Sequence, residues 1–286
     1  MIAGMASTSA AQKQTMDSDR SWFEDELLSR FTRYVRVFTT SDRHSEEVPS
    51  TARQLELARM LAEELSSLGV EDVDLDEKGY LLARLPESGS EYQNATPIGF
   101  MAHVDTSPDS SGENVQPQLH RSYDGGSLHL GNDVVLDPEE YPALANYKGA
   151  TIITSDGSTL LGGDDKAGIA EIMTALAYIV EHPDFPHGPI EIIFTPDEEI
   201  GRGMDHFPVE KARSRYCYTV DGGDEGSLEA ECFNAYLATV RFTGRVIHPG
   251  KARGKLVNAN TMAGLFLSML PRSEAPESTD GRYGFY

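Results

Sequence analysis

The sequence predicts an α/β protein in which a mostly parallel, twisted sheet is flanked by helices. Two observations predict this class. Short apolar runs alternate with helical patterns along most of the chain, and the run 190–194 (IEIIF) is apolar enough for a strand buried on both faces. Beyond about residue 230 the pattern changes. We therefore expect a flexible extension over 1–20, a first domain over 21–228 and an incomplete α+β domain over 229–286.

Helical periodicity marks four segments. A capping-box pattern at 21–24 opens the first, in which apolar residues recur every four positions from Phe23 to Val35. The second covers 51–68 and is followed by Gly69, a residue type common just after a helix end. The third and fourth helices are expected at 166–180 and 260–270.

Strands are expected where short apolar runs lie between turn residues. These runs are 80–85, 97–104, 151–154, 190–194 and 216–220. The segment 235–243 instead alternates apolar and polar residues, which is typical of a half-exposed strand. Because strands and helices alternate up to residue 220, most strands of the sheet are expected to be parallel.

The composition excludes several kinds of partner. The 286 residues include 46 acidic and 24 basic side chains, a net charge of −22 that disfavours nucleic acid and anionic membranes. No run of 18 apolar residues is present that could span a bilayer. With only two cysteines, Cys217 and Cys232, a disulfide-stapled secreted domain is not expected, and the cytoplasm is the expected compartment.

Polar residues that suit a metal follow the apolar runs, where ligands of α/β sheets collect. His103 and Asp105 lie two positions apart in an extended segment and so face the same way. His103 could therefore bind a metal while Asp105 orients its ring. Asp221 follows the run 216–220 and could add a carboxylate. Taken singly, a chance pair and an ordinary acidic turn explain these residues better than a metal site does.

Two further acidic groups strengthen the pattern. Asp164 and Asp165 follow two glycines and lead into a helix, although an ordinary acidic helix cap has the same form. Three consecutive acids, residues 197–199, follow the run 190–194 and would repel one another unless a cation were close. Together, the histidine and the carboxylates favour zinc, manganese or cobalt, and a carboxylate shared by two ions is the usual design of a two-metal hydrolase.

The residues around these clusters resemble the peptidase T branch of the zinc-dependent exopeptidases and deacylases, a superfamily that includes carboxypeptidase G and aminoacylases. The resemblance runs from about Trp22 to Tyr286. It is carried by AHVDTSPD, ITSDGSTLLGGDDKAGIAEIM, IIFTPDEEIGRGMDHF, YTVDGG and VIHPGKARGKLVNA. It implies a zinc exopeptidase-like catalytic domain over 21–228, a partial lid and dimerisation domain over 229–286, and removal of the N-terminal residue from tripeptides.

The resemblance also implies a set of metal ligands. His103, Asp164 and Asp221 would hold one zinc ion, and the Asp164 carboxylate would bridge to a second ion that Glu199 binds. The resemblance further implies two zinc ions per complete site and a short peptide as substrate. It also allows a homodimer formed through the lid domain.

Three catalytic roles follow from the same resemblance. Glu198 would act as the general base that takes a proton from the attacking water and passes it to the leaving amine. Asp105 would brace His103, and His248 of the lid domain would help to stabilise the oxyanion. The peptide bond between Asp164 and Asp165 is expected to be cis.

One departure from the family pattern matters. Family members carry a last histidine ligand of the second zinc in a catalytic-domain segment that follows the lid, whereas no histidine follows His248 here. We therefore expect a chain cut short within its lid domain and a weakly occupied second site. Two alternatives stay open: a related dipeptidase or N-acyl amino acid deacylase, and an inactive fragment that binds metal without turnover.

Overall fold

The computed structural model describes residues 10–223, 226–231, 234–282 and 284–286. The chain divides into the compact units Met1–Glu225 and Gly226–Tyr286. None of the helices that the structure describes combines the length and the apolar character needed to cross a bilayer.

Five strands of the first unit form one sheet in the order β1-β2-β8-β3-β9. They are β1 (Glu71–Leu75), β2 (Leu81–Leu85), β3 (Ile98–His103), β8 (Ile190–Thr195) and β9 (Tyr216–Thr219). β3 pairs in parallel with both β8 and β9, whereas β2 pairs antiparallel with β1 and β8. The α/β class is confirmed, and the sheet is mixed because β2 runs opposite to the other four strands. The expected pattern could not reveal this, because an apolar run is the same in either direction.

Both faces of the sheet are covered by apolar side chains. Ile192 and Phe194 of β8 lie in the main core with the helices, whereas Ile193 between them packs with Tyr80 and Leu82 on the opposite face. This alternation is what a strand with two buried faces requires. β9 differs, because all four of its residues are exposed at the edge of the sheet.

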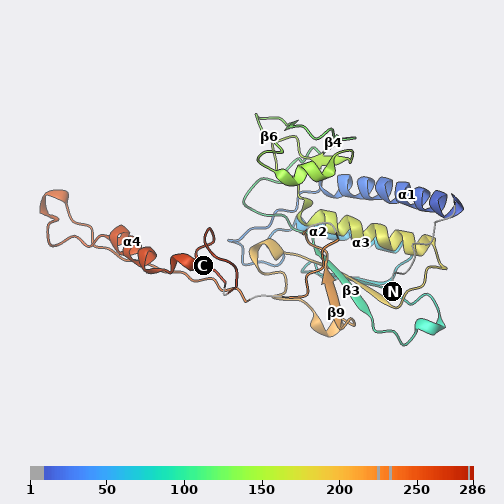
Figure 1. The fold of residues 1–286 in the computed structure, drawn as a ribbon. Coiled ribbons are helices and arrows are strands. Elements are labelled where there is room, and N and C mark those ends of the chain that lie inside the picture. Colours follow the sequence, from blue (N-terminus) through green and yellow to red (C-terminus); the bar gives the residue numbers. More distant parts are fainter. Residues whose placement is uncertain (1–9, 224–225, 232–233, 283) are drawn as a thin grey trace, which may run out of the picture. The chain divides into compact units, whose positions relative to one another are not determined.

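Three helices lie on one side of the sheet, α1 (Ala10–Tyr34), α2 (Gln54–Ser67) and α3 (Gly163–Glu181) (Figure 1). The expected stripe of α2 is confirmed, since Leu57, Leu61 and Leu65 are fully buried. Gly69 follows α2 with a positive φ of 81°, a conformation that glycine adopts without a steric penalty.

The first helix begins earlier than the capping-box pattern predicts. α1 starts at Ala10, so residues 10–20 are helical where we expected a flexible extension; residues 1–9 lie outside the described part. The segment Ala10–Gln14 (AAQKQ) consists of strong helix formers, and no glycine or proline separates it from Ser21. A potential cap therefore lies inside a longer helix.

The segment between β3 and α3 adds two small antiparallel strand pairs rather than strands of the main sheet. β4 (Gln118–His120) pairs with β7 (Ile152–Thr154), and β5 (Leu128–His129) pairs with β6 (Val135–Leu136). The expected strand at 151–154 is therefore present, but it has a local antiparallel partner.

The second unit contains one longer helix, α4 (Ala259–Met269), close to the expected 260–270. The strand expected at 235–243 is not found: these residues have no regular structure, and Leu237 is 96% exposed. A strand needs a neighbour for its backbone N–H and C=O groups, and the one bridge described in this unit joins Arg245 to Val257 instead.

Candidate metal centre

The ends of three parallel strands bring the candidate residues together. β3 ends at His103, β8 is followed by Glu198 and Glu199, and β9 is followed by Asp221. Since β8 and β9 both run parallel to β3, the residues that follow them lie at the same edge of the sheet.

The start of α3 supplies the fourth element of the site. Asp164 and Asp165 belong to the first turn of α3 but have non-helical φ and ψ, so regular helical backbone begins at Lys166. The peptide bond between the two aspartates is cis, as the family resemblance implied.

Gly168 lets α3 approach the end of β9 closely. A Cβ atom at this position would lie 1.9 Å from the carbonyl oxygen of Val220 and 2.4 Å from Oδ1 of Asp165. No other residue type fits there without a backbone shift. This close approach brings the residue after Val220, which is Asp221, next to the start of α3.

His103 is the centre of the cluster. Its Nε2 lies 2.8 Å from Oδ1 of Asp164, 3.8 Å from Oδ2 of Asp221 and 3.9 Å from Oε2 of Glu198. Its Nδ1 lies 3.0 Å from the backbone oxygen of Asp105 and 3.2 Å from Oδ1 of the same residue. Asp105 therefore fixes the ring so that Nε2 faces the carboxylates.

Asp105 also joins two strand ends. Its carboxylate is fully buried and accepts hydrogen bonds from the backbone N–H groups of Glu198, at 3.0 Å, and Glu199, at 3.2 Å. One side chain thus orients the imidazole of His103 and the turn that carries both glutamates.

The electrostatics of the site favour a bound proton or cation. Burial alone would lower the pKa of His103, but the hydrogen bond to Asp105 and the charges of Asp105 and Asp165 outweigh it and raise the pKa to about 10. Burial raises the pKa of Asp165 to about 8, with His103 opposing the shift and Asp221 adding to it. The negative charges of the clustered carboxylates therefore stabilise a proton or a cation bound among them.

The two partly exposed carboxylates of the site show the same tendency. Burial raises the pKa of Glu198, with His103 opposing the shift and Asp221 adding to it. The pKa of Asp221 is also raised by burial, with a contribution from the neighbouring Asp164. A carboxyl group whose pKa is raised takes up a proton more readily than an ordinary carboxylate does.

The donor set fits a divalent metal ion. His103, Asp164 and Asp221 each offer one ligand atom, and these atoms all lie within 4.8 Å of one another. One imidazole and two carboxylates would hold a metal ion with three protein ligands and leave a coordination position open, as catalytic metal sites do. Among the described residues, Glu199 is not part of this three-donor group, although its charge interacts with that of Asp164.

His248 belongs to the second unit. There its Nδ1 accepts a hydrogen bond from the backbone N–H of Gly250 at the start of the short helix η5 (Pro249–Lys251). The catalytic role expected for His248 stays a prediction.

Sequence reasoning assigned neither Asp165 nor Lys166 a role in the site. Oδ2 of Asp165 accepts a hydrogen bond from the backbone N–H of His103 at 3.1 Å, and Nζ of Lys166 donates one to the backbone oxygen of Val37 at 2.7 Å. Both side chains are buried, and burial lowers the pKa of Lys166 to about 7. Their position next to Asp164 could have marked them as site residues. Their hydrogen-bond partners could not be predicted, because these lie far away in the sequence.

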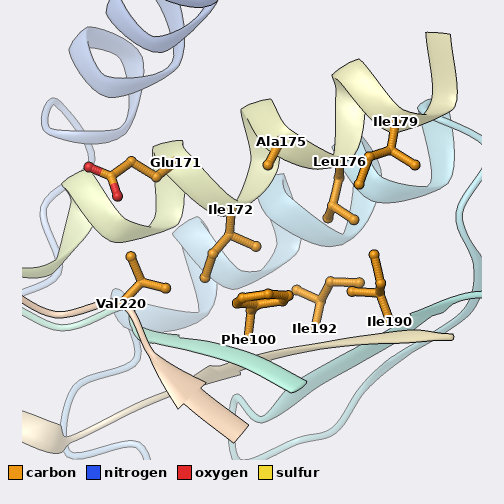
Figure 2. A pocket seen from close by; sticks show the side chains of 9 residues that line it. All are labelled: Phe100, Glu171, Ile172, Ala175, Leu176, Ile179, Ile190, Ile192 and Val220. Atoms are coloured by element: carbon orange, nitrogen blue, oxygen red, sulfur yellow. The ribbon is translucent and has the colours of Figure 1, made fainter. Parts of the chain in front are cut away.

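A cavity of about 180 Å³ lies between α3 and the sheet (Figure 2). Its walls are apolar apart from Glu171, and they include none of the residues that converge on His103. The lining residues are Phe100, Glu171, Ile172, Ala175, Leu176, Ile179, Ile190, Ile192 and Val220. A peptide backbone needs hydrogen-bond partners, so this cavity does not suit a peptide.

Comparison with known proteins shows which proteins this chain is similar to. The chain is 51% identical to peptidase T of Geobacillus sp. (strain WCH70) over 265 residues, which are 92% of this chain and 64% of that protein. The chain is thus similar to peptidase T over most of its own length. Peptidase T of Listeria monocytogenes serotype 4a (strain HCC23) is also 51% identical over the same shares of the two chains. The chain thus spans about 64% of the length of these curated relatives.

A family model and two solved structures agree with this relationship. Residues 133–241 match the model of peptidase family M20/M25/M40, a range that contains Asp164, Glu198, Glu199 and Asp221. The crystal structure of the aminopeptidase PepT from Bacillus cereus ATCC 10987 matches with a TM-score of 0.54 and 23% identity, over 86% of this chain and 57% of that chain. The crystal structure of a tripeptidase from Staphylococcus aureus subsp. aureus mu50 matches with a TM-score of 0.57 and 22% identity, over 90% of this chain and 58% of that chain. These two structures share the fold of this chain.

Proposed function

We propose that this chain carries the chemistry of a metal-dependent aminopeptidase that removes the N-terminal residue from tripeptides. The supporting observation is the convergence of Asp164, Asp221 and Glu198 on Nε2 of His103. The peptidase T relatives at 51% identity, and the aminopeptidase and tripeptidase that share the fold, point to the same reaction.

His103, Asp164 and Asp221 would hold one zinc ion, and Asp164 and Glu199 would hold a second. When bound, the ions lower the pKa of a water molecule and polarise the peptide carbonyl. The imidazole, fixed by Asp105, offers Nε2 as a ligand, and the two aspartates supply the negative charge that a divalent cation needs.

Glu198 would move the proton of the reaction. Its carboxylate lies on the open side of the cluster, with 54% of its side chain exposed and Oε2 within 3.9 Å of Nε2 of His103. Its raised pKa suits a group that accepts a proton from water and then gives it to the leaving amine. His248, in the proposed lid domain over 229–286, would help to stabilise the oxyanion.

The composition supports proposals about other partners and about the compartment. The net charge of −22 argues against nucleic acid and anionic membranes, and the two cysteines support the cytoplasm as the compartment. Formation of a homodimer through 229–286 remains part of the proposal and is tested by light scattering after size-exclusion chromatography.

The test is a hydrolysis assay with a base variant and a matched control. The wild-type chain, loaded with zinc, should cleave tripeptides faster than dipeptides, tetrapeptides or N-acyl amino acids. E198Q should retain zinc but lose about 100-fold or more of kcat, the range for removal of a general base. E210Q, at an exposed glutamate in the short helix η4 (Val209–Lys211), should match the wild type.

Three results would contradict the proposal. Cleavage of N-acyl amino acids in preference to tripeptides would favour the deacylase alternative. Zinc binding without any hydrolysis would favour a metal-binding chain without turnover. Equal activity of E198Q and the wild type would remove Glu198 from the mechanism.

A further inference from the structure

Asp197 immediately precedes the two glutamates of the site and has an unusual backbone. It follows β8 and has φ 57° and ψ 26°, in the left-handed region that few residues other than glycine adopt. The short helix η3 (Glu198–Ile200) begins directly after it. The conformation of Asp197 therefore sets the direction in which the chain enters the turn that carries Glu198 and Glu199.

The side chain of Asp197 is fully buried and bound on several sides. Oδ2 accepts a hydrogen bond from the backbone N–H of Ser50 at 2.7 Å. Oδ1 accepts from the Ser50 hydroxyl at 2.5 Å and from Nε2 of Gln54 at 2.7 Å. The backbone N–H of Asp197 in turn donates to Oε1 of Gln54 at 3.1 Å. The carboxylate thus joins the turn to the first residue of α2 and to the segment before it.

This contact and Asp105 hold the same turn from two sides. Asp105 accepts from the N–H groups of Glu198 and Glu199, whereas Asp197 fixes the residue before them against Ser50 and Gln54. Three hydrogen-bond donors face the carboxylate of Asp197, so the side chain at this position must offer acceptor atoms only. An asparagine at this position would tolerate the backbone but would direct its NH₂ group at a donor.

We propose that Asp197 is a positioning residue that fixes the carboxylates of Glu198 and Glu199 through its contacts with Ser50 and Gln54. This inference rests on the proposed function for its catalytic consequence. Its structural consequence, an ordered turn at 198–201 in the metal-free protein, is independent of any activity.

Glu191 provides a matched control. It lies on β8, near the opposite end of the strand, is 1% exposed, and accepts hydrogen bonds from the backbone N–H and the hydroxyl of Ser214. E191Q therefore disturbs the same kind of buried contact as D197N, but at a distance along the strand from the two glutamates.

Three measurements compare D197N, E191Q and the wild type. The first is hydrogen exchange of the metal-free proteins, in which D197N should exchange about ten-fold or more faster at 198–201, the effect of losing one charged hydrogen bond. The second is the visible spectrum of the Co²⁺-loaded proteins, which should change in D197N. The third is tripeptide hydrolysis, in which kcat should fall about 10- to 100-fold with little change in KM. E191Q should match the wild type in all three.

The inference is overturned if D197N keeps wild-type exchange at 198–201, or if D197N and E191Q change exchange and the cobalt spectrum alike. If D197N does not fold, S50A and Q54A each remove one donor and should give the same local exchange effect in a milder form. Absence of this effect in both variants also overturns the inference. If the proposed function is wrong, the wild-type chain will not hydrolyse tripeptides. In that case the hydrogen-exchange comparison still decides whether Asp197 orders the turn at 198–201.

Discussion

Replacing Glu64 by alanine should destabilise the folded protein by about 3–5 kcal/mol, the usual effect of removing one partner of a buried ion pair. Glu64 of α2 accepts hydrogen bonds from Nε of Arg30 at 2.9 Å and from the hydroxyl of Tyr34 at 2.8 Å, both on α1. Arg30 in turn contacts Oγ1 of Thr174 on α3 at 3.4 Å. One carboxylate therefore neutralises the charge that lies between all three helices of the first unit.

The size of the effect follows from exposure. The Arg30 side chain is 7% exposed and that of Glu64 is 14% exposed, so E64A leaves a buried guanidinium without its main partner. Glu26, whose side chain is 40% exposed, contacts Nη1 of Arg30 at 2.6 Å and remains as a partner in E64A, so the loss should lie toward the lower end of this range. The additional bond from Arg33, whose side chain is 48% exposed, contributes at most about 1 kcal/mol. In a domain of this size, the Tm should fall by about 10 °C.

The assay is urea unfolding of the metal-free protein, followed by circular dichroism. E63A, at the exposed neighbouring position on α2, is the matched control and should change the unfolding free energy by less than about 0.5 kcal/mol. The double variant R30M/E64L should regain most of the loss, because an apolar pair of similar volume needs no counter-charge. If E64A loses less than about 1 kcal/mol, or no more than E63A, the buried-charge reasoning is refuted.

Three further predictions concern the site. The 286-residue chain should retain about one zinc ion per chain after dialysis, because three donors converge at a single position among the described residues; two tightly held ions, measured by mass spectrometry, would contradict this. The metal-free protein should lose stability as pH rises from 6.5 to 10, because a raised pKa of His103 means that the folded state holds the proton more tightly. Asp165, with a pKa of about 8, acts in the same direction, and D105N should flatten the profile in urea unfolding at several pH values. G168A should weaken zinc binding measured by calorimetry, whereas G264A in α4, where a Cβ meets nothing within 4 Å, should not; equal affinities would refute the close-approach argument.

Much of the local structure could be predicted from the residues alone. The stripe Leu57, Leu61 and Leu65 identified α2, and the apolar run 190–194 identified β8, because both patterns follow from which side chains must avoid water. The polar residues after the strands also predicted the group that meets around His103. Two local signals misled. The capping-box pattern at 21–24 does not start a helix, because the helix formers before Ser21 extend α1. The alternating segment 235–243 is not a strand, because it has no strand beside it to pair with.

The tertiary structure alone decided which residues meet. His103 and Asp165 are 62 residues apart, and Ser50 and Asp197 are 147 apart, so no local pattern could pair them. The sequence determined the secondary structure and the chemical types at the strand ends, since these depend on neighbouring residues and on burial. The direction of β2, the close approach at Gly168 and the contacts of Asp197 depend on how distant segments pack, and only the folded chain brings those atoms within reach of one another.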